Sequence, residues 1–356
     1  MIRKGLFSIL ITSIFSIFMG SSFSSLCQTP SNDLNWALDS AKSDEFNSTS
    51  INTSKWHILD CPGGDCCNYG GGTAFEKGNV SDSGGLLRLR TDGPGFAPIP
   101  CNRETYATAG IVSDSGYYSY GYFEIYAKLP GFYSNGNPCG RKFYPAFWTA
   151  YQKVDSSCVV IHNEIDILEP SGAQYANANR NVCGWWFQNG HCGAYKVIQA
   201  IYNSSVPLFT GFHKYAVEWT PNSMVFFFDD MPFVENYNSP AMIMNPQQVF
   251  IDQQLSDSSV HFCDGITFPQ YMSVDYFRYY KLNLDCGTSS VLLTNTDLAA
   301  YVYSVKSDIT FGNGTNSISL NSTDKKYFRA VNTITINGTF TAPLGSELGL
   351  LPTACN

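Results

Sequence analysis

Alternating apolar and polar side chains recur along most of the chain. Residues 122–129 alternate in this way and are followed by a Pro-Gly pair. Residues 215–219 and 224–228 are two further apolar segments, and they are separated by residues 220–223, in which Pro and Asn favour a turn. Because successive side chains of a strand point to opposite faces, these segments predict short β-strands joined by turns.

Segments of this kind occupy the chain from about residue 36 to 281, with little helical periodicity. Many short strands without a regular alternation of strands and helices predict an all-β fold with two stacked sheets. The concave face of such a sheet forms a groove that suits a polymer. We therefore expect a β-sandwich with a groove over residues 28–285.

The composition changes after Cys286. Residues 287–356 contain no Trp and are rich in Ser, Thr, Asn and aliphatic side chains. Residues 334–340 have the pattern of a strand, a turn and the start of a second strand. We predict a small β-rich module over residues 286–356, which serves either as a structural or secretion-related appendage or in carbohydrate binding.

The first 27 residues have the pattern of a secretory signal peptide. Arg3 and Lys4 precede an apolar run over residues 6–19, and small residues follow it. This run is shorter than a membrane-spanning helix requires. We expect residues 1–27 to be removed and the mature chain to be secreted, with no membrane association.

The chain contains 12 cysteines, which fits export to an oxidising compartment. We expect most of them to form disulfides, whose connectivity the sequence leaves open. Aromatic residues make up 15% of the chain and charged residues only 14%, with a net charge of −8. This composition excludes intrinsic disorder, and the acidic balance argues against a nucleic-acid partner. Low charge with many rings fits a protein that handles a neutral, stackable ligand.

Three carboxylates within six residues, Glu164, Asp166 and Glu169, form the most informative segment. In a regular strand Glu164 and Asp166 share one face, whereas Glu169 falls on the other because it is five residues from Glu164. A β-bulge around residues 167–168 corrects this parity and brings all three carboxylates to one face. Ile165 would then anchor the opposite face in the core.

Carboxylates two residues apart on one strand face repel each other, and no basic side chain lies between these. Such an arrangement is more often functional than structural, and a strand with an acidic solvent face is the alternative. Glycosidic cleavage needs two carboxylates in different environments, one ionised and one protonated. Asp166 can hold a proton or a hydrogen bond between the two Glu residues.

Residues 164–169 resemble the ExDxxE signature of glycoside hydrolase family 16. Four flanking segments resemble further strands of that family in the same order, namely residues 120–130, 145–148, 212–220 and 274–280. The resemblance covers about residues 36–283 and implies a β-jelly-roll. It also implies that Glu164 is the nucleophile of a retaining hydrolase, Asp166 its helper and Glu169 the general acid/base.

The six-residue, bulged form of the signature resembles laminarinases, agarases and carrageenases, whereas lichenases and xyloglucan transferases have a form one residue shorter. Residues 251–257 depart from the Gly-rich loop of laminarinases. We therefore expect a secreted, endo-acting, retaining O-glycosyl hydrolase of β-linked polysaccharides. A laminarin-like β-1,3-glucan is favoured, and an algal galactan is the other substrate class. A transglycosylase on the same fold and a non-catalytic glucan-binding protein are the alternative functions.

Six further residues are candidates for substrate binding: Asn68, Arg141, Trp148, Trp185, Trp186 and Trp219. Trp148 is a candidate sugar-stacking platform, and Trp219 alternates within its strand and can face either the groove or the core. Trp185 and Trp186 lie in an expected loop between Cys183 and Cys192.

The family resemblance suggests Asn68 as a sugar ligand and Arg141 as a ligand of a hydroxyl or sulfate group. It also suggests Asp275 as a ligand of a structural calcium ion. We expect no other cofactor, and a monomer whose partner is the polysaccharide substrate.

Overall fold

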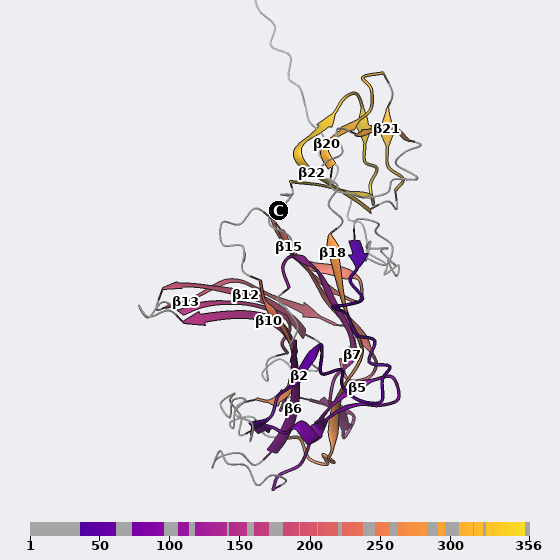
Figure 1. The fold of residues 1–356 in the computed structure, drawn as a ribbon. Helices are drawn as coiled ribbons and strands as arrows, with labels where there is room; N and C mark the ends of the chain where they lie inside the picture. The colour runs from indigo at the N-terminus through magenta and orange to yellow at the C-terminus, as the bar shows by residue number, and fades with distance from the viewer. Residues whose placement is uncertain are drawn as a thin grey trace, which may run out of the picture.

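The computed structural model describes residues 36–61, 73–95, 106–113, 118–140, 142–154, 160–170, 181–191, 193–204, 206–219, 223–237, 246–256, 262–282, 291–295, 306–315, 317–322 and 325–352. Nearly all regular structure in these ranges is β-strand (Figure 1), which confirms the all-β fold class. The expected signal peptide lies outside the described residues. No helix in the described ranges is long and apolar enough to span a bilayer.

Within the described ranges, most strands belong to two eight-stranded sheets. The first sheet has the order β16-β15-β14-β7-β18-β5-β4, and β1 pairs with β18 beside this path. Its strands are β1 (Trp36–Leu38), β4 (Val80–Asp82), β5 (Leu87–Thr91), β7 (Gly121–Lys128), β14 (His213–Trp219), β15 (Ser223–Phe228), β16 (Met231–Tyr237) and β18 (Gln270–Leu282).

The second sheet has the order β13-β12-β11-β10-β17-β6-β2, and β3 pairs with β6 beside this path. Its strands are β2 (Trp56–Ile58), β3 (Thr73–Phe75), β6 (Tyr106–Ser113), β10 (Phe143–Val154), β11 (Val160–Leu168), β12 (Asn181–His191), β13 (Gly193–Asn203) and β17 (Gln248–Leu255). In Figure 1, β10, β12 and β13 extend to the left of β7 and β5. The central strand β10 lies between β11 and β17, so side chains from three strands meet on each of its faces.

The main core lies between the two sheets. Strand β7 contributes Phe123, Ile125 and Ala127, which are all fully buried. Phe147 of β10 meets Phe277 of β18 edge-on, with ring centroids 6.0 Å apart, and this contact joins the two sheets. Burial of each large apolar side chain contributes about 1.5–3 kcal/mol, so this layer supplies much of the stability of the sandwich.

In the first half of β7 the alternation separates two buried faces, whereas farther along the outer face Tyr126 is half-buried and Lys128 is exposed. Tyr122 and Glu124 point away from the main core, and both are almost fully buried. Tyr122 belongs to a second apolar cluster on the outer side of the first sheet, together with Trp36, Ala216, Val225, Phe227 and Tyr280. Glu124 is therefore a buried carboxylate outside the acidic segment.

A smaller β-structure follows in the last part of the chain. Strands β19 (Val291–Leu293), β20 (Lys306–Phe311), β22 (Lys325–Ile336) and β24 (Glu347–Pro352) pair in parallel, and β21 (Ile318–Ser319) pairs in parallel with β23 (Phe340–Thr341). Its own buried cluster is Ile309, Phe311, Ile318, Leu320, Phe328 and Ala330. The expected boundary at residues 285–286 lies outside the described residues, so the division into two domains stays a prediction.

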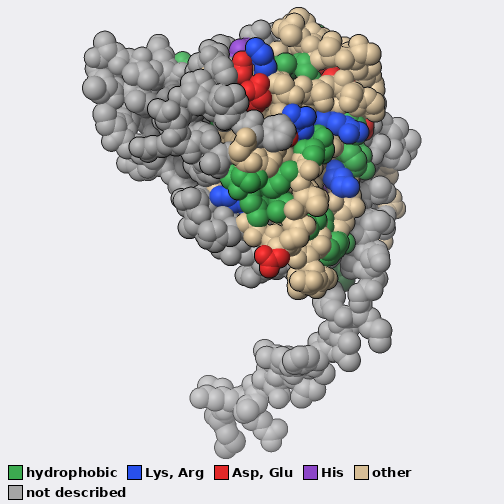
Figure 2. All heavy atoms as spheres, turned by 90° about the horizontal axis from the view of Figure 1, so that it is seen from below, with side chains coloured by type: hydrophobic (Ala, Val, Ile, Leu, Met, Phe, Trp, Pro, Cys, Tyr) green, Lys and Arg blue, Asp and Glu red, His purple; other side chains and the backbone are tan. Residues whose placement is uncertain are grey.

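Figure 2 shows the molecule from below, where apolar side chains lie side by side with several Lys and Arg and with fewer acidic side chains. Large apolar side chains with substantial exposure include Tyr133 and Val206.

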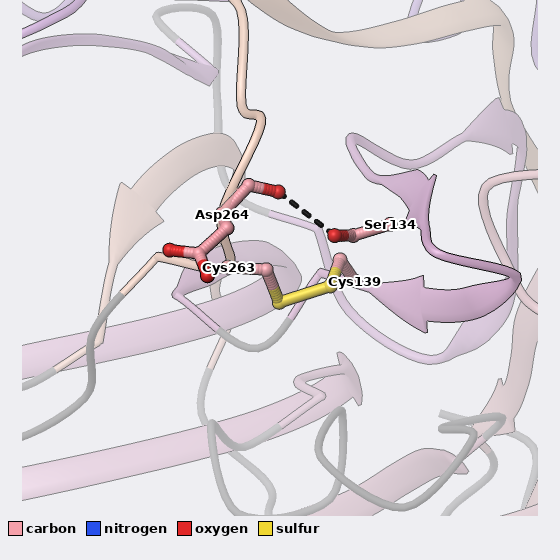
Figure 3. Close-up of a disulfide and its surroundings, with 4 residues drawn as sticks. All are labelled: Ser134, Cys139, Cys263 and Asp264. Carbon is pink, nitrogen blue, oxygen red and sulfur yellow. Dashed lines mark hydrogen bonds between the residues drawn. A yellow bond between two sulfur atoms is a disulfide. The ribbon is translucent and has the colours of Figure 1, made fainter.

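A short hairpin, β8 (Phe132–Ser134) and β9 (Asn137–Cys139), precedes the central strand β10. Cys139 at its end forms a disulfide with Cys263, with the two Cα atoms 6.1 Å apart. The Ser134 hydroxyl also donates to the carbonyl oxygen of Asp264, so the hairpin is tied twice to the segment before β18 (Figure 3). Because Cys139 lies four residues before the start of β10 at Phe143 and five before Tyr144, these two links help to fix the start of the strand that contributes to the site described next.

Candidate active site

The acidic strand β11 contains the expected bulge. Phe147 of β10 lies opposite Leu168, whereas its neighbour Trp148 lies opposite Asp166, so Ile167 is an extra residue in β11. Ile165, Ile167 and Leu168 are all fully buried in the main core. Two consecutive aliphatic side chains thus enter the core, and the acidic side chains are left on the other face. The bulge predicted at residues 167–168 is confirmed.

Glu164 and Asp166 lie on the face of the second sheet that points away from the core. Asp166 lies opposite Trp148 and is buried, whereas Glu164 is partly exposed. Glu169 is also partly exposed and follows the end of β11. The hydroxyl of Tyr144, which shares a face of β10 with Trp148, donates to Glu169 Oε1 at 2.5 Å. The structure therefore brings the three predicted carboxylates to one face of the sheet.

A fourth carboxylate, Asp252 of β17, lies on this same face. The indole Nε1 of Trp148 donates to Asp252 Oδ2 at 2.7 Å, and Gln254 Nε2 donates to Oδ1 at 2.8 Å. The Trp148 ring also stacks on Phe250, with centroids 4.2 Å apart and planes 16° from parallel. Trp148 is thus held at its edge and on one face, and its orientation on the sheet is set by two neighbours on β17.

Burial raises the pKa of Asp252 to about 6, and the charge of Glu164 acts in the same direction, while its two hydrogen bonds oppose the shift. Burial also raises the pKa of the Tyr144 phenol, and the charge and hydrogen bond of Glu169 add to this effect. Asp166 and Asp252 raise it further. The charges of the acidic segment therefore act on side chains of two other strands, on Tyr144 of β10 and on Asp252 of β17.

Two predicted substrate-binding residues are placed differently from the expectation. Trp185 and Trp186 lie in strand β12 rather than in a loop, and their backbones stand opposite Asp166 and Ile165 of β11. Because β12 runs unbroken as a strand over Asn181–His191, the polar sequence around the two Trp residues does not form a loop there. In the pairing of β12 with β11, the backbone of Trp185 thus lies beside that of Asp166 in the acidic segment.

The prediction that Trp219 contacts substrate is wrong. Trp219 is fully buried in the main core, where it packs edge-on against Tyr120 with ring centroids 5.1 Å apart. Its strand β14 belongs to the first sheet, and its alternation directs residue 219 inward with Val217 and Tyr215. A fully buried ring has no surface to offer a sugar.

The structure does not test the remaining predicted ligands. Asn68 and Arg141 lie outside the described residues. Asp275 lies in β18 where its pairing with β7 shifts register between Val274 and Tyr276. Within the described ranges, no three His, Cys, Asp or Glu side chains come together as metal ligands. A calcium ion at Asp275 stays a prediction.

Sequence reasoning missed Tyr144, Asp252 and Gln254. The signal that finds them is the period of two along β10 and β17, since Tyr144 and Trp148 share a face, as do Asp252 and Gln254. That signal is usable only when β17 is known to pair with β10, which places Asp252 opposite Ala146. A single Asp in a strand carries no motif by itself.

Comparison with known proteins agrees with this geometry. The model of the family described as "Glycosyl hydrolases family 16" matches residues 72–256, just over half of the chain and including the whole acidic segment. An endo-1,3-1,4-beta-glycanase, EglC, of Rhizobium meliloti (strain 1021) is 26% identical over 171 residues, which cover 47% of this chain and 31% of that protein. The chain thus spans about a third of the length of the curated relatives that head the comparison.

Two solved structures have the same fold. The laminarinase catalytic domain from Thermotoga maritima MSB8 superposes with a TM-score of 0.55 at 21% identity, over 69% of this chain and 98% of that chain. Porphyranase B from Zobellia galactanivorans superposes with a TM-score of 0.55 at 18% identity, over 69% of this chain and 92% of that chain. With the family match spanning the bulged acidic strand, the chain belongs to family 16 of the glycosyl hydrolases.

Proposed function

We propose that the protein is an exported, endo-acting hydrolase that cleaves β-linked polysaccharides with retention of anomeric configuration. The observation that carries this proposal is the bulge in β11, which leaves Glu164, Asp166 and, directly after the strand, Glu169 on one face of the sheet near Trp148. Membership of the family supports hydrolysis of glycosidic bonds. A binding protein without catalysis would have no need of three clustered carboxylates, whose mutual repulsion costs stability.

In this mechanism Glu164 attacks the anomeric carbon while Glu169 donates a proton to the departing glycosidic oxygen. The bond from the sugar to that oxygen breaks, and an ester bond from the sugar to Glu164 forms. Glu169, now ionised, removes a proton from water, which attacks the anomeric carbon and releases Glu164. Asp166 lies between these two residues on the same face and, when it holds a proton, can donate a hydrogen bond to Glu164.

A β-1,3-glucan is the favoured substrate. Similarity to a Rhizobium meliloti protein named an endo-1,3-1,4-beta-glycanase and to a Thermotoga maritima laminarinase supports a glucan as the substrate. The similar fold of a porphyranase keeps an algal galactan as the second class. The low content of Lys and Arg, 21 in 356 residues, favours a substrate with little sulfate.

A panel of laminarin, lichenan, agarose, porphyran and carrageenans tests the proposal, with reducing ends and product sizes measured over time. We expect laminarin to give a series of oligosaccharides, as internal cleavage does. Release of monosaccharide alone would contradict the endo mode, and strong activity on a highly sulfated carrageenan would contradict the glucan. NMR of the first anomer formed tests retention, and oligosaccharides longer than the substrate would indicate transglycosylation.

Export is part of the same proposal. The pattern of residues 1–27 and the disulfide between Cys139 and Cys263 both support a secreted protein. Expression of the full chain in a secreting host, followed by N-terminal sequencing of the protein from the medium, tests it. We expect a mature N-terminus close to residue 28. Retention of the whole chain inside the cell would contradict export.

A further inference from the structure

Tyr144 occupies a position on the catalytic face that the mechanism above does not use. It lies in β10 opposite Gln254 of β17, four residues before Trp148, and is partly buried. Its hydroxyl is 2.5 Å from Glu169 Oε1. Burial raises the pKa of this phenol, and the Glu169 carboxylate raises it further, so Tyr144 is neutral and is the donor in this hydrogen bond.

A general acid must present its proton to the glycosidic oxygen from one of its two carboxyl oxygens. An oxygen that already accepts a hydrogen bond from a phenol is best left unprotonated, because a proton there would face the donor hydrogen. We propose that Tyr144 is a positioning residue for Glu169, holding Oε1 as an acceptor so that the transferable proton resides on Oε2. This inference rests on the proposed role of Glu169 as the general acid/base.

The Tyr144 hydroxyl lies among several carboxylates, whose charges affect its pKa. The charged groups that act on Tyr144 are carboxylates, namely Glu169, Asp166 and Asp252. Lys142, two residues earlier on the same face of the chain, directs its Nζ to the carbonyl oxygen of Ser256. Neighbouring negative charges therefore disfavour ionisation of the Tyr144 phenol, and its hydroxyl donates to Glu169. Ionisation of Glu169 is needed when it acts as the base in the second step.

The variant Tyr144→Phe removes the donor and keeps the ring. For aryl β-glycosides of the oligosaccharide that the wild-type enzyme accepts, we expect kcat/KM to fall about 10- to 100-fold with a poor leaving group such as 4-methylphenol. With 2,4-dinitrophenol, which departs without a proton, the change should be about threefold or less, since general acid catalysis is then not required. Tyr133→Phe, on the exposed β8–β9 hairpin, is the matched control and should leave both substrates unaffected.

Equal losses on the two leaving groups would overturn the proposal, because a merely structural role of Tyr144 weakens both reactions alike. A second measurement does not depend on activity. In protein labelled with ¹³C at the Glu carboxyl carbons, the resonance of Glu169, assigned by its absence in Glu169→Gln, is titrated in wild type and in Tyr144→Phe. Loss of a hydrogen bond to the charged form should move this titration upward by about 1 to 2 pH units.

The two measurements separate failure of the inference from failure of the proposed function. An upward shift in a protein that hydrolyses none of the glycans supports the contact between Tyr144 and Glu169 and contradicts the proposed function. An unchanged titration in an active enzyme contradicts the inference and leaves the proposed function standing. An upward shift together with the selective loss on the poor leaving group supports both.

Discussion

Two buried carboxylates, one on each sheet, look alike until their neighbours are compared. Asp252 on β17 and Glu124 on β7 are both almost fully buried, and burial raises the pKa of both. Each accepts a hydrogen bond from an aromatic side chain, Asp252 from the indole of Trp148 and Glu124 from the hydroxyl of Tyr276 at 2.8 Å. Burial and hydrogen bonding therefore do not distinguish them.

The signs of the surrounding charges do distinguish them. Lys214 and Arg278 lower the pKa of Glu124 and so offset its burial, although Asp230 acts against them. The charged group that acts on Asp252 is Glu164, which has the same sign and adds to the shift. A buried carboxylate on which nearby cations act to lower the pKa suits a structural role, whereas one whose pKa is raised further by a second carboxylate points to a functional site.

The largest effect that tests this comparison is on activity. Glu164→Ala should lower kcat by about a thousandfold or more, because no nucleophile remains for the double displacement. Glu124→Gln, which removes the buried charge on the other sheet, should leave kcat within a few-fold of wild type. Assays on the most active glycan of the panel measure both. Comparable losses of kcat in the two variants would contradict the assignment of catalysis to the face that carries Glu164.

Rescue of the variants by azide distinguishes the roles of Glu164 and Glu169. Added to Glu164→Ala with an activated aryl glycoside, the small anion should enter the space of the missing carboxylate and give a glycosyl azide of inverted configuration. Glu169→Ala should instead give the azide with retained configuration, since Glu164 can still form the ester. NMR of the isolated azides checks both outcomes, and the opposite pair would exchange the roles of the two residues.

The hydrogen bond between Trp148 and Asp252 should have an intermediate effect. Asp252→Ala leaves the indole N–H without its acceptor and frees the ring, so we expect kcat/KM to fall about 10- to 100-fold. Trp148→Phe should have a similar effect, and the double variant should lose much less than the product of the two losses, because the residues act as one unit. Independent, multiplicative losses would contradict a positioning role for Asp252.

A smaller effect concerns stability and pH. Because the folded-state pKa of Asp252 is raised to about 6, the folded protein binds more protons than the unfolded chain between about pH 4 and pH 6. The contribution of Asp252 to stability therefore falls as pH rises through this window and is constant above it. In Asp252→Asn this loss is absent, so the stability of the variant relative to wild type should rise by up to about 3 kcal/mol between pH 4 and pH 7.

Urea unfolding at several pH values measures this difference. Asp264→Asn, at an exposed carboxylate in the turn before β18, provides the baseline. If the difference in unfolding free energy between Asp252→Asn and wild type does not change with pH, the pKa of Asp252 is not raised in the folded protein. Asp252 would then not share with Glu124 a pKa raised by burial.

The smallest expected effect comes from the last part of the chain. Deletion of residues 287–356 should leave kcat/KM on soluble oligosaccharides within about threefold of wild type, because every residue assigned to the catalytic face precedes β18, and distant sites act independently. Loss of folded protein would show that this part belongs to the sandwich. Loss of binding to insoluble glycan alone would favour a carbohydrate-binding role.

Local patterns in the sequence were enough to predict the acidic strand. The parity of Glu164, Asp166 and Glu169 requires one extra residue, and the aliphatic pair Ile167-Leu168 is the only place between the acids where it can be absorbed without burying a charge. Alternation of strand faces is a property of the backbone itself, so it can be derived without knowing which strands are neighbours.

The tertiary structure alone decided which aromatic and acidic side chains join that strand. Trp148 and Trp219 both lie in alternating strands, yet one is partly exposed beside the acids and the other is fully buried in the core. Asp252 and Tyr144 reach the site because β10 lies between β17 and β11, strands that are far apart in the chain. A sequence specifies the two faces of each strand locally, whereas the face that becomes core depends on the sheet packed against it.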